Sequence, residues 1–173
     1  MPISSFLRRP SRHLAIAVLV CVPVVPWIVA ASAQSSPAAP VIVPRHIYSE
    51  TAKPAKDIAA ALALASSQHK RVILDFGGDW CGDCQVLDIY FHQPPNAALL
   101  DQNFILVHVW IGQMDHNISL AKKYGVPIAK GVPALAVLAP DGRVLYSQQT
   151  GQFNDMRHME SSSVTEFLEK WKT

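Results

Sequence analysis

The chain has 173 residues, of which 50% are hydrophobic and 16% are charged, and its formal net charge is +2. This length suits one domain with an extra segment, and the composition is that of a folded globular protein. The positive sign comes from Arg8, Arg9 and Arg12, because the rest of the chain carries a net charge of −1. Nucleic-acid binding normally requires a basic face, so the composition argues against a nucleic-acid partner.

The first 33 residues have the features of a signal peptide. The basic start leads into an apolar run over 14–30, and an Ala-Ser-Ala triplet ending at Ala33 then suits cleavage by a signal peptidase. Two prolines interrupt the run, which weakens it as a permanent membrane helix. We therefore predict a signal peptide over 1–33 and export to the periplasm or beyond. The alternative is an uncleaved anchor that tethers the protein to the membrane.

Residues 34–53 are rich in Pro, Ala and Ser, which is typical of a flexible lead. If the signal peptide is cleaved, Cys21 is lost and the mature chain keeps only Cys81 and Cys84. A disulfide that closes so short a loop stabilises little through chain entropy, and a core of this size does not need one. The pair therefore points to redox chemistry or to a metal site.

Residues 54–173 alternate between helical and strand patterns. Apolar residues at helical spacing predict a helix over 57–68, and a β-branched run predicts a buried strand over 72–76 that contains one acid, Asp75. Further along, the patterns predict helices over 85–91, 96–102, 117–124 and 163–172, and strands over 104–110, 134–139 and 143–147. This order predicts an α/β sandwich on a mixed sheet with a parallel core and an antiparallel hairpin.

The two cysteines stand three positions apart at the start of a predicted helix, directly after a buried strand and a Gly-Gly break. The N-terminus of a helix presents free N–H groups and a partial positive charge to Cys81, which favours the nucleophilic thiolate. The spacing of one helical turn holds the Cys84 sulfur near enough to attack a mixed disulfide on Cys81. This placement is a far more specific signal than a Cys-x-x-Cys alone.

The run Leu74-Asp75-Phe76, followed by Trp80-Cys81-Gly82-Asp83-Cys84, resembles the strand and the Trp-Cys-x-x-Cys motif of the thioredoxin superfamily. Asp75 stands where thioredoxins carry a buried acid, and Gly131-Val132-Pro133-Ala134 resembles the cis-proline loop of the family. The resemblance covers roughly residues 57–172 and implies a thioredoxin-like three-layer sandwich with a central mixed β-sheet.

Two departures separate this sequence from cytosolic thioredoxin. Gly82-Asp83 replaces the Gly-Pro of thioredoxins, and residues 91–100 form an insertion. The chain is therefore closer to the exported thioredoxin-like disulfide reductases.

The resemblance also implies roles for individual residues. Cys81 would attack a substrate disulfide, and Cys84 would resolve the mixed disulfide. Asp75 would accept the Cys84 proton, since an acid in an apolar strand can exchange protons near neutrality; the alternative is a strand-end acid paired with Lys70 or Arg71. The residues expected to dock a substrate strand are Trp80, Val132 and Pro133, with a cis peptide before the proline.

Gly82 and Asp83, between the cysteines, are expected to tune the redox potential. A carboxylate here opposes the helix dipole and disfavours the Cys81 thiolate, which makes the disulfide a weaker oxidant. Potentials in the family span about −270 to −120 mV, so we predict a value toward the reducing end. Alternatively, Asp83 is a plain solvated charge. Asp88, on the same helix, is expected to face solvent.

The sequence therefore predicts an enzyme of the cell envelope that reduces protein disulfides. Its redox centre would be the Cys81–Cys84 disulfide, with no other cofactor and with the chain acting as a monomer. In an oxidising compartment the pair stays oxidised unless it receives electrons, which implies a membrane electron donor as a partner.

The alternative is a metal-binding module that delivers copper through the same thiols. A metal needs more ligands, and the available histidines are His92, His108, His116 and His158. None stands at a recognisable metal-ligand spacing, so no metal site is predicted.

Overall fold

Helices and strands alternate through residues 45–173, the part of the chain that the computed structural model describes. The predicted signal peptide and the first part of the predicted lead lie outside the described residues. In chain order the elements are α1 (Pro54–Gln68), β1 (Arg71–Gly77), α2 (Gly82–Phe91), α3 (Asn96–Asn103), β2 (Phe104–Trp110), α4 (Ile118–Lys123), η1 (Ile128–Lys130), β3 (Ala134–Leu138), β4 (Val144–Ser147), η2 (Met156–His158) and α5 (Ser162–Trp171). Every helix and strand predicted from the sequence is present.

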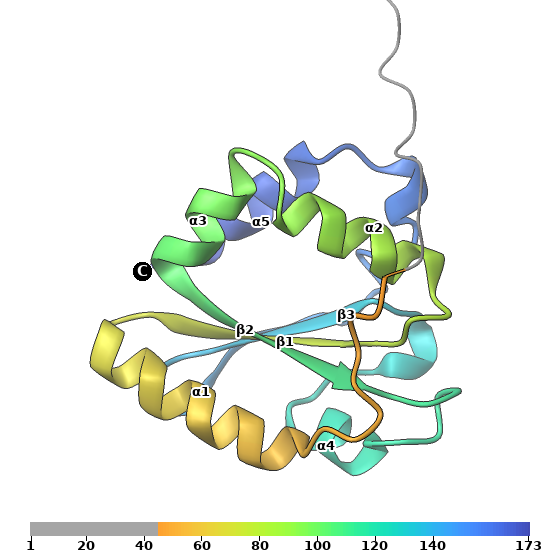
Figure 1. Cartoon of the computed structure of the whole chain (residues 1–173), viewed down its shortest axis with the longest axis horizontal. Coiled ribbons are helices and arrows are strands. Elements are labelled where there is room, and N and C mark those ends of the chain that lie inside the picture. The colour runs from red at the N-terminus through yellow and green to blue at the C-terminus, as the bar shows by residue number, and fades with distance from the viewer. Residues whose placement is uncertain (1–44) are drawn as a thin grey trace, which may run out of the picture. The chain divides into compact units, whose positions relative to one another are not determined.

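The four strands form one sheet in the order β2-β1-β3-β4 (Figure 1). β1 runs parallel to β2 and antiparallel to β3, and β3 runs antiparallel to β4. Parallel neighbours need a crossover, which α2 and α3 supply between β1 and β2. The mixed sheet with its antiparallel hairpin is the one predicted.

Helices cover both faces of the sheet, with α1 and α4 on one side and α2, α3 and α5 on the other (Figure 1). Successive side chains of a strand point to opposite faces, so Leu74 and Phe76 pack in the core under α1 while Ile73 packs in the core under α2. By the same alternation, Asp75 points toward α2. The three-layer α/β sandwich is therefore confirmed, and its one β1 acid lies under the helix that begins at the cysteines.

Residues 45–50, here called the strap, belong to the segment predicted to be flexible, yet they are held against the start of α2. The backbone N–H groups of Ile47 and Tyr48 donate to Asp79 Oδ1 at 2.8 and 3.0 Å. The Gln85 side chain accepts from the Arg45 N–H at 2.9 Å and donates to its carbonyl at 2.8 Å. These bonds bring the strap, and the fully buried Tyr48, to the cysteine end of the domain.

The predicted insertion contains the end of α2, a cis Pro94–Pro95 peptide and the start of α3. Buried Asn96 docks it, because its Nδ2 donates to the carbonyls of Tyr90 and Ser161 and its Oδ1 accepts from Thr165. Within residues 45–173, no helix combines the length and apolar character needed to cross a membrane.

Candidate active site

Cys81 and Cys84 form a disulfide at the start of α2. Cys81 is the N-cap of this helix, and its Sγ accepts a hydrogen bond from the Cys84 backbone N–H at 3.1 Å. After reduction the same N–H and the helix dipole would stabilise negative charge on Cys81. Cys81 is 6% exposed and Cys84 is fully buried, so Cys81 is the sulfur that an incoming disulfide can reach.

A surface hollow of about 470 Å³ opens beside Cys81. The Val132 carbonyl oxygen lies 3.6 Å from Cys81 Sγ, and the Val132–Pro133 peptide is cis, as the resemblance implies. Buried Gln148 holds this loop, because its Nε2 donates to the Pro133 carbonyl at 3.2 Å and its Oε1 accepts from the Leu135 N–H at 3.3 Å. The hollow is lined by Trp80, Cys81, Gly82, Asp83, Met114, Gly131, Val132, Asn154 and Arg157.

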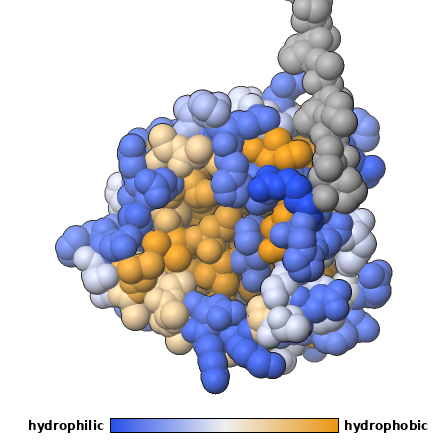
Figure 2. Space-filling view, in the orientation of Figure 1, coloured by the Kyte–Doolittle hydropathy of each residue, from blue (hydrophilic) through white to orange (hydrophobic). Residues whose placement is uncertain are grey.

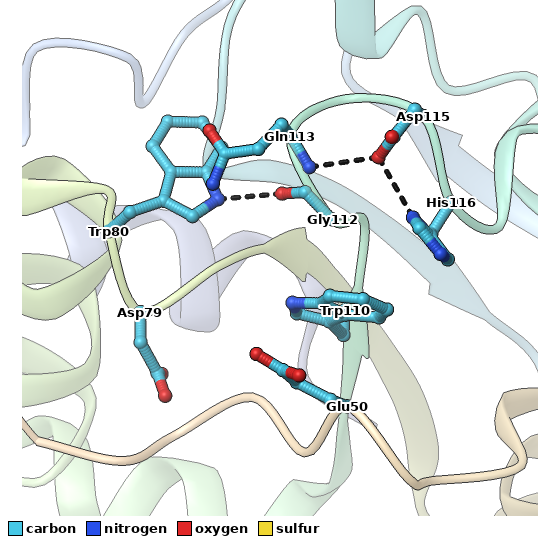
Figure 3. Close-up of a pocket in the computed structure, with 8 residues that line it drawn as sticks. All are labelled: Glu50, Asp79, Trp80, Trp110, Gly112, Gln113, Asp115 and His116. Atoms are coloured by element: carbon cyan, nitrogen blue, oxygen red, sulfur yellow. Dashed lines mark hydrogen bonds and ion pairs between the residues drawn. The ribbon is translucent and has the colours of Figure 1, made fainter.

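Trp80 is 47% exposed and lines both this hollow and a second one of about 360 Å³, whose lining Figure 3 shows. Its indole Nε1 donates to the Gly112 carbonyl at 2.6 Å. The loop that follows is braced by Asp115, whose Oδ1 accepts from the Gln113 N–H at 2.9 Å and lies 2.8 Å from His116 Nδ1. This loop supports the indole that borders Cys81.

Asp75 is fully buried and belongs to a polar cluster behind the disulfide. Its Oδ2 accepts a hydrogen bond from Tyr48 Oη at 2.6 Å and lies 2.9 Å from His108 Nδ1, whereas its Oδ1 is buried without a partner. The alternative pairing with Arg71 is wrong, because Arg71 donates instead to the Trp171 carbonyl.

Asp88 was expected to face solvent, and this expectation is wrong: the residue is 3% exposed. The strap covers this side of α2, and Arg45 Nη1 lies 2.7 Å from Asp88 Oδ2 in an ion pair without an aligned hydrogen bond. Asp88 Oδ1 lies 3.3 Å from His92 Nδ1 and 3.9 Å from His108 Nε2. His108 thus stands between two buried carboxylates.

The environment of His108 has opposing effects on its ionisation. Burial disfavours the charged ring, but the hydrogen bond and the negative charge of Asp75, with smaller contributions from Asp88 and Asp79, outweigh it and raise the pKa of His108. The folded protein therefore holds a proton on this ring more tightly than the unfolded chain does.

Asp83 is 8% exposed, and a partner far along the chain occupies its carboxylate, so it is not a plain solvated charge. Its Oδ1 accepts from the Arg157 backbone N–H at 3.0 Å and from Nε at 3.2 Å, and its Oδ2 lies 3.2 Å from Nη2. The same hydrogen bonds and charge raise the pKa of Arg157. Any effect of Asp83 on Cys81 is therefore weakened by a guanidinium that the motif does not reveal.

Residues 53–140, about half of the chain, match the family model described as thioredoxin-like. The chain belongs to the thioredoxin-like family.

Two relatives extend this result. The thiol:disulfide interchange protein DsbD of Pseudomonas fluorescens is 30% identical over 132 residues, which are 75% of this chain and 20% of that protein, so the chain spans about a fifth of the length of this relative. The solved structure of a disulphide isomerase from Xylella fastidiosa Temecula1 superposes with a TM-score of 0.70 at 34% identity, covering 73% of this chain and 96% of that one. This thioredoxin-like protein therefore has relatives named for disulfide chemistry.

The structure brings Trp80, Val132, Gly82 and Asp83 around Cys81 and places Asp75 on the Cys84 side of the motif. Sequence reasoning missed the partners of the two acids. His108 could have been found, because it is the register partner of Asp75 in the predicted parallel strands. Tyr48 and Arg157 carry no such signal. Among residues 45–173, no group of three or more His, Cys, Asp or Glu side chains is arranged to hold a metal ion.

Gly77 leaves no room for a side chain between the strap and the disulfide. A Cβ there would lie 2.6 Å from Tyr48 Oη and 2.8 Å from Cys84 Sγ. We predict that Gly77→Ala lowers the free energy of unfolding by about 1–3 kcal/mol, because Tyr48 must shift. Denaturant titration measures the loss. Gly82→Ala is the matched control, since the nearest atom to its Cβ would be Arg157 Cδ at 3.4 Å, and equal losses in both variants would contradict the prediction.

Removing the guanidinium of Arg157 leaves the Asp83 carboxylate without a positive charge beside it, although the backbone N–H of residue 157 still donates to it. We predict that Arg157→Ala disfavours the Cys81 thiolate and moves the midpoint potential roughly 10–20 mV in the negative direction. Equilibration against glutathione buffers measures the potential. Arg143→Ala, which removes an arginine that pairs with Asp141 in the β3–β4 turn, should leave it unchanged. A shift to a more positive potential would refute the effect assigned to Asp83.

The raised pKa of His108 predicts a pH-dependent stability. Its ordinary value is 6.5, so the stabilising contribution is complete below about pH 6.5 and is lost as the pH rises through the higher folded value. The free energy of unfolding of wild type relative to His108→Gln should therefore fall as the pH rises above that point. Denaturant titrations across this range test it, and the trend should disappear in an Asp75→Asn background. A difference that grows with pH contradicts it.

Proposed function

We propose that this protein is a thiol–disulfide oxidoreductase of the cell envelope that reduces disulfides in other proteins. The observation that carries the proposal is the position of Cys81. It caps α2, its sulfur receives the Cys84 N–H at 3.1 Å, and it lies at the edge of an open hollow beside the cis Val132–Pro133 loop. A thiolate stabilised in this way, and reachable from solvent, is the group that attacks a disulfide.

The reaction follows from the different exposure of the two sulfurs. The Cys81 thiolate attacks one sulfur of the substrate disulfide, whose other sulfur leaves as a thiolate and takes a proton. The buried Cys84 then loses its proton and attacks Cys81 Sγ, which forms the Cys81–Cys84 bond and releases the second substrate thiolate. Two electrons pass to the substrate, and the enzyme is left oxidised.

The substrate strand would dock along the hollow, with Trp80 on one side of Cys81 and Val132 with Pro133 on the other. Trp80 is exposed but held by its hydrogen bond to Gly112, so it offers a fixed apolar surface. Trp80 and the rest of the lining can select the substrate without taking part in the sulfur chemistry.

The oxidised pair must be reduced before a second turnover, and the protein needs no cofactor beyond the two cysteines. We assign this reduction to a membrane electron donor, and we place a monomeric enzyme in the periplasm or tethered to the membrane. The predicted signal peptide supports this location. The chain is similar to about a fifth of a thiol:disulfide interchange protein, and this similarity supports a partner in a larger electron-transfer system.

We predict that the reduced protein reduces the disulfides of insulin, followed by the turbidity of the released chains. Cys81→Ser should abolish the activity, because no sulfur remains that a substrate can reach. Cys84→Ala should instead accumulate mixed disulfides on Cys81, identified by mass spectrometry after extraction from the envelope.

Two further measurements make this test decisive. The midpoint potential should lie toward the reducing end of the range of about −270 to −120 mV. Thiol and metal content should show free thiols and no stoichiometric metal. A potential near −120 mV, or bound copper without reductase activity, would overturn the proposal.

A further inference from the structure

The buried side of the disulfide lies near a group of polar side chains. Tyr48 Oη and Cys84 Sγ both lie against Gly77, where a Cβ would be 2.6 Å from the first atom and 2.8 Å from the second. The Tyr48 hydroxyl donates to Asp75 Oδ2, and the same oxygen lies 2.9 Å from His108 Nδ1. A hydroxyl, a carboxylate and an imidazole therefore follow one another behind Cys84.

We propose that Tyr48 and His108 are positioning residues that connect Cys84, through Asp75, to a proton exit at the edge strand β2. This inference rests on the proposed function and adds how the resolving cysteine exchanges its proton. Cys84 is fully buried, so water has no direct route to its sulfur. Each turnover nevertheless requires Cys84 to lose a proton when the disulfide forms and to regain one when it is reduced.

The strap is what makes Tyr48 part of this path. Its backbone is fixed by Asp79, and its ring is fully buried. Burial, together with the nearby Asp75 carboxylate, raises the pKa of Tyr48 well above its ordinary value, so it stays a neutral hydroxyl. Such a group can accept a proton from Cys84 on its oxygen while its own proton moves to Asp75.

The other end of the path meets solvent. β2 is an edge strand, and the His108 side chain is 22% exposed. A hollow of about 430 Å³, lined by α1 and β2 residues, reaches His108. Figure 2 shows apolar surface gathered over the middle of the same face, where Figure 1 places β2. The exposed part of the imidazole therefore gives the buried polar groups a contact with solvent.

Charged groups on β1, on α2 and in the turn between them act on the imidazole. Asp75 faces it from β1 and Asp88 from α2, with Asp79 further away. Asp88 is also contacted by Arg45 from the strap and by His92 from the end of α2. The two close carboxylates favour the imidazolium, so His108 holds a proton that it can release when Asp75 becomes protonated.

The transfer balances as follows. The Cys84 proton moves to Tyr48 as the Tyr48 proton moves to Asp75, which leaves a Cys84 thiolate, a neutral tyrosine and a protonated carboxyl. Once Asp75 is protonated it no longer stabilises the positive charge on His108, so the imidazolium releases its Nε2 proton to solvent and keeps the Nδ1 proton that faces Asp75. The thiolate attacks Cys81 Sγ, forms the Cys81–Cys84 bond and expels the substrate thiolate with both electrons of the broken bond. Reduction of the disulfide uses the path in the opposite direction.

The test isolates the attack by Cys84. Reduced protein is mixed rapidly with an aromatic disulfide that releases a coloured thiolate, which leaves without needing a proton. The rate of the first release is proportional to the reagent concentration and reports the attack by Cys81. The rate of the second release does not depend on the reagent concentration and reports the attack by Cys84. Tyr48→Phe and His108→Gln should slow the second release roughly tenfold or more near pH 7 and leave the first unchanged.

The pH profile separates a proton path from structural damage. Above about pH 9, hydroxide that reaches the thiol during local opening of the site ionises it without the path, because a cysteine thiol ordinarily titrates near pH 8.5. The second release in both variants should there approach the wild-type rate. The controls Tyr90→Phe, whose hydroxyl contacts the Met159 carbonyl, and His158→Gln, whose exposed ring contacts Asp155, should match wild type throughout. No slowing near pH 7, or the same slowing at every pH, overturns the inference.

Rescue by a small molecule provides a second measurement. His108→Ala should lose the fast second release near pH 7, and added imidazole should restore it by entering the hollow beside β2. The same imidazole should not restore Tyr48→Phe. Failure of rescue in His108→Ala contradicts an exit through the ring. If wild type reduces insulin while these variants behave as wild type, the proton path fails and the proposed function stands.

Discussion

The cysteine end of this protein depends on a carboxylate buried in the sheet. Taking an ionised carboxylate out of water without partners costs several kcal/mol, so Asp75 is tolerated only where donors surround it. β2 supplies one, because the parallel register sets His108 beside Asp75. The second comes from outside the sheet, in the hydroxyl of Tyr48. The strap and the edge strand thus meet at one acid, whose Oδ2 they both contact while its Oδ1 has no partner.

The two sulfurs of the motif face different surroundings as a result. On the outer side, Cys81 has a helix N-terminus, an open hollow and the carbonyl of the cis-proline loop. On the inner side, Cys84 has buried polar groups and no exposed surface. A thiolate on Cys81 is stabilised by fixed N–H dipoles, whereas a thiolate on Cys84 requires that a proton be removed from a closed site. The start of α2 therefore favours the attack by Cys81 on a substrate disulfide, and the polar groups of the sheet favour the later attack by Cys84 on the mixed disulfide.

The fold could be predicted from the sequence because its evidence is local. β-branched runs, the Gly-Gly break, the helical spacing and the Asp-Gly turn each report on the residues around them, and all nine helices and strands that they predicted are present in residues 45–173. Only those residues of the site that belong to a recognisable sequence motif could be predicted. His108 was within reach of reasoning from strand register. Asp88 was misassigned because the helix pattern does not reveal that a segment preceding the domain covers that face of α2.

The residues that pair with the two acids were not predicted for one shared reason, which is that they lie far from these acids in the sequence. Arg157 meets Asp83 across a separation of 74 residues, and Tyr48 meets Asp75 across 27, from a segment whose composition indicates a flexible lead. In both cases the acid is found from the motif, whereas the residue that pairs with it is not. A carboxylate between or behind two cysteines acts on them according to its own hydrogen bonds, because a charge shared with a guanidinium or a hydroxyl is not the charge of a free acid. The redox character of such a site therefore depends on the long-range contacts of its acids as much as on the two residues between its cysteines.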